Sequence, residues 1–269
     1  MRCFLLLAAP VLLLGAARPG SRPAPATPPR PATAAAPLAA PGAVLPNATR
    51  NALLARTNLG RLWQHRPQAG TEDVLNGCFG YDGRRLEIVF TTVQSDAHSP
   101  GRYLVAGKFR CYGDVTPFRG SIELQQVQRL PADVAVYDDN SRSEVPTYCA
   151  TGAFALQATS RHGLGGQLTG RVALDFQLTA SHRAVLMANT ANPATRNGGL
   201  LFEGSWADGP GRETTPVVWK QGIAVTRDIF TRFEIGNRDM HINPKYARVG
   251  WNNFWKNEEW WVERQIAQR

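Results

Sequence analysis

The sequence predicts an all-β protein, mainly an antiparallel meander that forms a barrel of about eight strands or a strongly coiled sheet. Between residues 84 and 219, alternating apolar and polar residues, rich in β-branched and aromatic types, are separated by short turns with Gly, Pro or Asp. Several of these segments carry an internal glycine, as strands of small barrels do where they coil sharply. A short N-terminal helix and an aromatic-rich C-terminal helical segment are expected beside the barrel.

The chain begins with the features of a signal peptide, which we expect to span residues 1–17. Arg2 precedes an almost wholly apolar run up to Leu14, and small residues ending at Ala17 follow. The run is short for a membrane span and Pro10 interrupts it, although an uncleaved membrane anchor is the alternative. We therefore expect cleavage near Ala17 and a protein that is secreted or held in the periplasm or cell envelope.

Two segments separate the signal peptide from the barrel region. Residues 18–46 are rich in proline and alanine and contain no acidic residue, which predicts a disordered spacer. Residues 47–74 form a helical lead-in, whose apolar residues lean toward one side of a helix expected at 50–63. The formal net charge is +9, but the arginines are scattered and form no stripe, so we predict no nucleic-acid partner.

Seven or eight strands are expected in the barrel region, residues 75–222. In the first clear segment, Leu86, Ile88 and Phe90 share one face, and Asp82-Gly83 ahead of them favours a hairpin turn. The acidic stretch from Tyr137 to Pro146 lacks the spacing of a calcium loop and is expected to be a solvated loop. The segments that alternate in this way are 84–93, 103–110, 118–127, 148–157, 167–178, 200–206 and 214–219.

A hairpin unit of glycine, aromatic residue, polar turn and second glycine recurs along this region. It includes Gly107-Lys108-Phe109 and ends in Phe202-Glu203-Gly204-Ser205-Trp206. In this unit the chain resembles uncharacterised exported bacterial β-barrel proteins of the lipocalin and avidin type, over roughly residues 75–222. The resemblance implies the barrel fold. It implies no biotin site, since no matching residue set is present, and the lipocalin Gly-x-Trp signature near the first strand is missing.

The C-terminal segment, residues 223–269, departs from the strand pattern. If it is helical, one apolar stripe is formed by Trp251, Phe254, Trp255, Trp261 and Val262. We expect this segment to pack against the barrel, because an exposed stripe of this size would promote aggregation. The alternative is an exposed aromatic platform for a glycan or a membrane interface.

Three cysteines remain after cleavage at Ala17. In an oxidising compartment one disulfide is expected, and we favour Cys111 with Cys149 because each lies beside a strand-like run. The alternative is three buried, reduced thiols, with Cys78 the third. The cysteine spacings suit neither a zinc site nor a CxxC redox motif, and we predict no metal and no cofactor.

The sequence contains no recognisable catalytic motif. We therefore assign no catalytic residues and favour a protein that is not an enzyme. The five histidines are isolated from one another, and no Gly-x-Ser-x-Gly elbow occurs. Glu203, Asp208 and Glu213 surround one hairpin. They keep open a hydrolase that uses paired carboxylates.

The function expected first is therefore a non-catalytic binding module for a small or hydrophobic ligand or a glycan. A barrel of about eight strands has room for side chains or one small ligand. The candidate lining residues are Phe176, Phe202, Trp206 and Trp219. The alternatives are an envelope-associated structural or interaction protein and the hydrolase. Contact with a membrane surface is not predicted, and the oligomeric state is left open.

Overall fold

A computed structural model describes residues 42–65, 74–131, 133–134, 145–160, 164–209, 211–221, 229–234, 239–254 and 259–262. Residues 230–234 and 239–240 are described by their backbone only. The signal peptide expected at 1–17, the spacer as far as residue 41 and most of the Tyr137–Pro146 loop lie outside these ranges. Within them, each helix is too short or too polar to cross a membrane.

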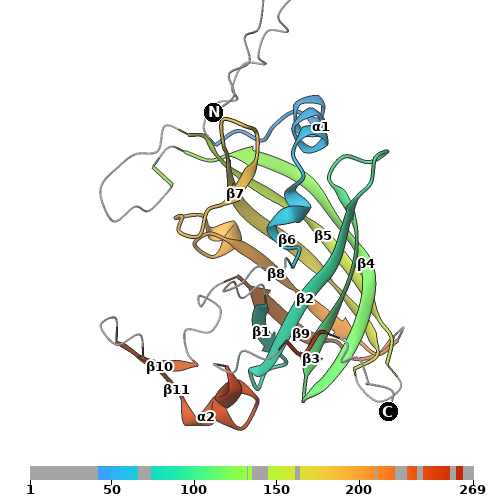
Figure 1. Ribbon diagram of the computed structural model, residues 1–269, viewed down its shortest axis with the longest axis vertical. Helices are drawn as coiled ribbons and strands as arrows, with labels where there is room; N and C mark the ends of the chain where they lie inside the picture. Colours follow the sequence, from blue (N-terminus) through green and yellow to red (C-terminus); the bar gives the residue numbers. More distant parts are fainter. Residues whose placement is uncertain are drawn as a thin grey trace, which may run out of the picture. The chain divides into compact units, whose positions relative to one another are not determined.

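Eight antiparallel strands close into a barrel, which confirms the predicted fold class (Figure 1). Each strand pairs with the next along the chain, β9 pairs with β1 to complete the ring, and a short additional strand, β7, extends the edge of β6 beyond β8. The strands are β1 (Leu75–Phe79), β2 (Arg84–Ser95), β3 (Arg102–Cys111), β4 (Asp114–Arg129), β5 (Thr147–Ala158), β6 (Gly166–Leu178), β7 (Ala184–Leu186), β8 (Leu200–Ala207) and β9 (Thr215–Lys220).

Strand alternation sends one set of apolar residues into the barrel, as the sequence pattern indicates. In β2, Leu86, Ile88 and Phe90 are fully buried. All seven strands expected from alternation are present. Six are longer than expected, and the last, β9, is shifted by one residue. Alternation did not single out β1. It is five residues long and has Gly77 at its centre, where the backbone passes directly against Trp219 of β9.

Close backbone contact between β6 and β8 accounts for one pair of the strand glycines. Gly170 lies directly opposite Gly204 in the register. A Cβ atom added at Gly170 would collide with the carbonyl oxygen of Glu203, and one at Gly204 would collide with that of Thr169. The two strands therefore coil around each other at a separation that only glycine permits.

The N-terminal helix closes one end of the barrel. Helix α1 (Asn47–Arg56) and the 3-10 helix η1 (Leu59–Leu62) replace the continuous helix expected at 50–63. We call residues 46–63 the flap. Its buried side chains belong to the same apolar cluster as the barrel interior, and they are Leu53, Leu54, Leu59 and Trp63.

Backbone hydrogen bonds anchor the flap on both sides. Ahead of it, the Leu45 N–H donates to the Val127 carbonyl of β4 at 2.8 Å, so the end of the expected spacer is ordered against the barrel. After it, the His65 N–H donates to the Phe90 carbonyl of β2, also at 2.8 Å. The flap is thus a covalent loop that is anchored to the barrel by a backbone hydrogen bond at each end.

The C-terminal segment contains short elements in its described part. They are a two-stranded sheet of β10 (Phe230–Glu234) and β11 (Asp239–Ile242), a single helical turn α2 (Pro244–Ala247) and the 3-10 helix η3 (Trp251–Asn253). Trp251 is fully buried, and its Nε1 donates to the Gly83 carbonyl at 2.8 Å. In the described part of this segment, helical structure is confined to single turns. Pro244 is the first residue of α2, and Gly250 (φ +102°) separates α2 from η3.

The glycine pair gives a direct test of strand coiling. We expect Gly170→Ala to lower the free energy of unfolding by about 3 kcal/mol or more, because the methyl group has no space and the strands must separate. Gly165→Ala is the matched control, since a Cβ there would meet its nearest atom only at 3.5 Å. Urea unfolding of both variants measures the difference, and equal stabilities would contradict the close-contact explanation.

Candidate functional site

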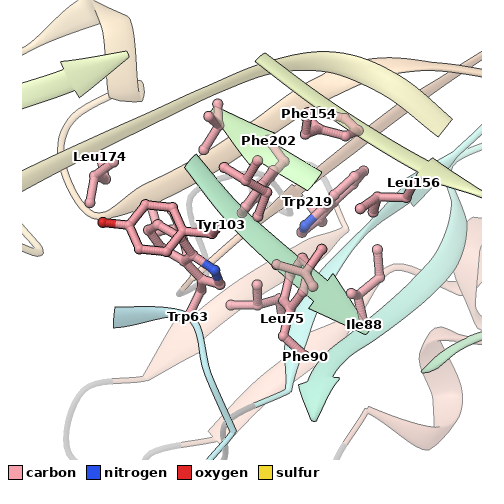
Figure 2. Close-up of a cluster of buried hydrophobic side chains, with 14 of the residues drawn as sticks. Trp63, Leu75, Ile88, Phe90, Tyr103, Phe154, Leu156, Leu174, Phe202 and Trp219 are labelled. Carbon is pink, nitrogen blue, oxygen red and sulfur yellow. The ribbon is translucent and has the colours of Figure 1, made fainter. Parts of the chain in front are cut away.

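Stacked aromatic rings fill the centre of the barrel (Figure 2). Phe202 lies between Trp219, at 4.9 Å between ring centroids, and Phe90, at 5.7 Å. Phe154 meets the Trp219 ring edge-on at 5.0 Å. Phe202, Trp219 and Phe90 expose no surface at all, so no water-sized void adjoins them. With the flap in place, this part of the interior is packed as a core.

The four candidate lining residues occupy three different levels of the barrel. Phe202 and Trp219 lie together at the centre. Phe176 is near the flap end of β6, stacked on Tyr148 at 5.6 Å. Trp206 is half-buried toward the opposite end, with its ring 5.6 Å from that of Phe79. The structure therefore brings Phe202 and Trp219 together and separates Phe176 from Trp206.

Three indole N–H donors in the barrel region, those of Trp63, Trp206 and Trp219, are buried and make no hydrogen bond within the described part of the chain. Trp206 is half-buried toward the end opposite the flap, whereas Trp63 and Trp219 are buried in the interior. Figure 2 shows the nitrogen of each ring on the edge that faces the other ring. A buried donor without an acceptor costs about 1–3 kcal/mol, so these two N–H groups are places where an added acceptor would stabilise the interior.

Tyr103 packs against Trp63 in the interior. Its ring meets the Trp63 ring edge-on at 5.1 Å, and its hydroxyl accepts a hydrogen bond from the Leu59 N–H at 3.2 Å. Burial raises the pKa of Tyr103 to about 12, so the phenol is neutral at physiological pH. The hydroxyl thereby holds the flap in place without adding a charge to the interior.

A cavity of about 190 Å³ lies along the seam between the flap and the β2–β3 turn. Flap residues form one wall and turn residues the other, with Tyr103 at the inner side. The seam is thus incompletely packed, in contrast to the centre of the barrel. Its lining residues are Leu54, Ala55, Arg56, Asn58, Ser95, Asp96, Ala97, Pro100, Gly101 and Tyr103.

A buried carboxylate organises the loop outside β6. Asp175 is fully buried, and its Oδ2 accepts hydrogen bonds from the hydroxyls of Thr190 at 2.6 Å and Thr195 at 2.7 Å. Its Oδ1 accepts from the Asn192 amide at 2.7 Å. These three residues flank or belong to the 3-10 helix η2 (Pro193–Thr195). Sequence reasoning missed this cluster, although an aspartate between Leu174 and Phe176 was a signal of it.

Lys220 completes this polar network from β9. Its Nζ donates to the carbonyl oxygens of Thr195 at 2.8 Å and Arg196 at 2.6 Å. Burial lowers the pKa of Lys220, and the nearby charge of Asp175 opposes that shift. Every polar atom of the Asp175 carboxylate has a partner, so we assign the cluster a structural role.

The expected disulfide does not form: Cys111 and Cys149 are both free thiols, as is Cys78. Cys111 pairs with Asp114 at one end of β4, and Cys149 pairs with Gln128 at the other end. At about 3.3 Å of rise per residue, these positions are tens of ångströms apart along β4, whereas a disulfide needs Cα atoms within about 7 Å. Proximity to a strand therefore did not indicate proximity to each other.

The carboxylates considered for a hydrolase lie in different surroundings. Glu203 is bound by two arginines, Arg171 and Arg196, on the outside of the barrel. Asp208 and Glu213 are exposed. Among the described residues, no group of three or more His, Cys, Asp or Glu side chains is close enough to hold a metal ion.

Comparisons with protein-family models, with curated proteins and with solved structures found no match. The eight-stranded antiparallel barrel is consistent with the lipocalin-like fold that the sequence resembles. The finer family assignment stays a prediction.

The Asp175 cluster predicts a large loss of stability on truncation. In Asp175→Ala, the donors of Thr190, Asn192 and Thr195 lose their acceptor in a buried site, so we expect about 3 kcal/mol or more of destabilisation and opening of the loop. Urea unfolding and limited proteolysis of this loop measure the two effects. The exposed Asp208→Ala is the control, and a similar small change in both variants would show that the cluster is not structural.

The cysteine assignment predicts slow alkylation in the folded protein. Burial raises the thiol pKa of Cys78 to about 11 and those of Cys111 and Cys149 to about 12, so little thiolate is present at pH 7.5. After denaturation without reductant, all three should react with iodoacetamide. Peptide mass spectrometry measures both, and an unlabelled, cross-linked Cys111–Cys149 pair would contradict the structure.

Proposed function

We propose that the chain is an exported, non-catalytic binding protein whose barrel takes a small apolar ligand that carries one hydrogen-bond acceptor. Export rests on the signal-peptide features of residues 1–17 and would place the protein outside the cytoplasm. The closed barrel and its wholly apolar, aromatic centre support the binding role.

The ligand would occupy the space that the flap side chains fill in the structure, and the flap would move out as the ligand enters. The flap contributes Leu53, Leu54, Leu59 and Trp63 to the apolar cluster from outside the strands, so their removal leaves the barrel itself intact. The backbone hydrogen bonds of Leu45 and His65 would keep the two ends of the flap attached to the barrel while it moves. The seam cavity, about 190 Å³ in volume, lies where such a movement would begin.

The observation that carries the proposal is the pair of buried indole donors without acceptors. Displacing the flap removes one of them, Trp63, and leaves Trp219 N–H directed toward the vacated space. A ligand carbonyl, ether or carboxylic acid would accept that hydrogen bond, which the flap does not supply. Phe202 would pack beside the ligand, Phe176 would lie toward the flap end and Trp206 toward the opposite end.

We expect full-length protein to bind a neutral long-chain probe, the methyl ester of dansylundecanoic acid, with enhanced dansyl fluorescence. Trp219→Phe keeps a ring but removes the donor, so the affinity should fall about 10-fold, equivalent to about 1.4 kcal/mol. Arg50→Ala removes a flap side chain that donates to the Gln125 carbonyl of β4, and it should tighten binding several-fold because the flap opens more easily.

The control is Arg119→Ala, which removes an exposed arginine from β4 and should leave the affinity unchanged. Urea unfolding confirms that each variant is folded at the assay temperature. Absence of probe binding to the full-length protein would refute the proposal. Equal affinity of the two test variants and the control would also refute it, because the probe would then bind outside the barrel.

A further inference from the structure

An asparagine–glycine pair lies in the loop between β7 and β8, which contains η2 and covers Asp175. Asn197 is exposed, whereas Gly198 is buried. Both have positive φ angles, +73° for Asn197 and +100° for Gly198, which asparagine and glycine tolerate better than other residues. Because glycine has no side chain to hold its nitrogen away from the preceding amide, the local sequence favours spontaneous deamidation of Asn197.

Deamidation at such a pair begins with attack by the glycine nitrogen. The Gly198 nitrogen bonds to Cγ of the Asn197 side chain and loses its proton, and the side-chain nitrogen takes up a proton and leaves as ammonia. Water then opens the resulting succinimide ring at either of its two carbonyl groups, which gives aspartate or isoaspartate. The reaction therefore needs only water and a Gly198 nitrogen that is free to approach Cγ.

The fold engages that nitrogen in a hydrogen bond. Gly198 N–H donates to Oγ1 of Thr195 at 2.9 Å, and the Thr195 hydroxyl in turn donates to Oδ2 of Asp175 at 2.7 Å. The Thr195 side chain is fully buried. A hydrogen bond donated by the neutral N–H stabilises it against the deprotonated form, which is the form that attacks Cγ. The attacking nitrogen is thus held inside the loop, while the amide that it would attack is in solvent.

The backbone on both sides of the pair is also held. Asn197 N–H donates to the Asn192 carbonyl at 3.0 Å, and Gly199 N–H donates to the Met187 carbonyl at 2.6 Å. Closure of the succinimide ring requires the peptide unit between Asn197 and Gly198 to rotate, and these hydrogen bonds oppose the rotation. The loop must therefore open locally before the reaction can take place.

We infer that Asn197 is a latent modification site, which stays an asparagine while the loop is docked on Asp175 and converts to aspartate and isoaspartate when the loop opens. Isoaspartate adds a methylene group to the backbone, so the hydrogen bonds of residue 197 and Gly199 cannot both form again. An opening of the loop that is otherwise reversible thereby becomes permanent. The inference is independent of the apolar site inside the barrel.

Peptide mapping of the full-length protein, incubated at mildly alkaline pH with and without urea, tests the inference. Mass spectrometry measures aspartate plus isoaspartate at residue 197 over time. We expect the folded protein to be modified at least about 10-fold more slowly than the unfolded protein, because the loop is closed most of the time. A synthetic peptide of residues 193–201 corrects for the effect of urea on the reaction itself. Equal rates in the folded and unfolded protein would overturn the inference.

Substitutions of Thr195 show whether its hydroxyl provides the protection. Thr195→Val removes the acceptor of the Gly198 N–H and keeps the shape of the side chain, so it should speed the modification of Asn197 at least about 10-fold. Thr195→Ser keeps the hydroxyl and should remain close to the wild-type rate. Thr169→Val is the matched control at an exposed position of β6, and it should leave the rate unchanged.

A second asparagine–glycine pair, Asn76–Gly77 in β1, serves as the internal reference for unfolding of the whole barrel. The rate at Asn197 is divided by the rate at Asn76 in the same digest, so that only opening of the loop raises the ratio. We expect this ratio to rise in Thr195→Val and not in Thr169→Val. The same ratio in Thr195→Val as in the wild type would overturn the inference.

Discussion

Close backbone contact between neighbouring strands, which only glycine permits at positions such as Gly170 and Gly204, is the constraint on which the rest of the structure depends. Strands that coil this tightly close a ring of eight, and a ring of that size leaves an interior only wide enough for side chains or one small ligand. The aromatic rings of Phe90, Phe202 and Trp219 then fill its width. The coiling of the strands therefore determines both that the barrel closes and how large a ligand its interior could hold.

The outside of the barrel is organised differently from the inside. Buried ionic clusters there are covered by segments that the barrel does not need for closure. Asp175 lies beneath the η2 loop, and Glu87 lies beneath the C-terminal aromatic residues. A buried carboxylate keeps its hydrogen-bonding and ionic partners only while the segment that covers it stays docked on the barrel. The covers are therefore bound by the polar groups beneath them as well as by apolar contact.

The sequence predicted the strands well because alternation and turn chemistry are local signals. Leu86, Ile88 and Phe90 show their common face from spacing alone, and the barrel follows from the repetition of such segments. Contacts between distant segments were predicted poorly. The residues next to Cys111 and Cys149 in the sequence do not indicate that these cysteines pair with opposite ends of β4. Likewise, Arg248 and Arg84 line the same cavity only because the C-terminal segment folds back onto β2.

A barrel whose interior is filled by side chains can still bind a ligand when some of those side chains, here the ones of the flap, move out. Undocking the flap exposes Leu54, Leu59 and Trp63, which costs about 1.5–3 kcal/mol for each side chain. An apolar ligand of similar size regains most of that free energy by burying the same surface of the barrel. Whether the flap or the ligand occupies the interior then depends on the interactions that only one of them makes. The hydrogen bond to Trp219 Nε1 is such an interaction, since the flap leaves that donor unpaired.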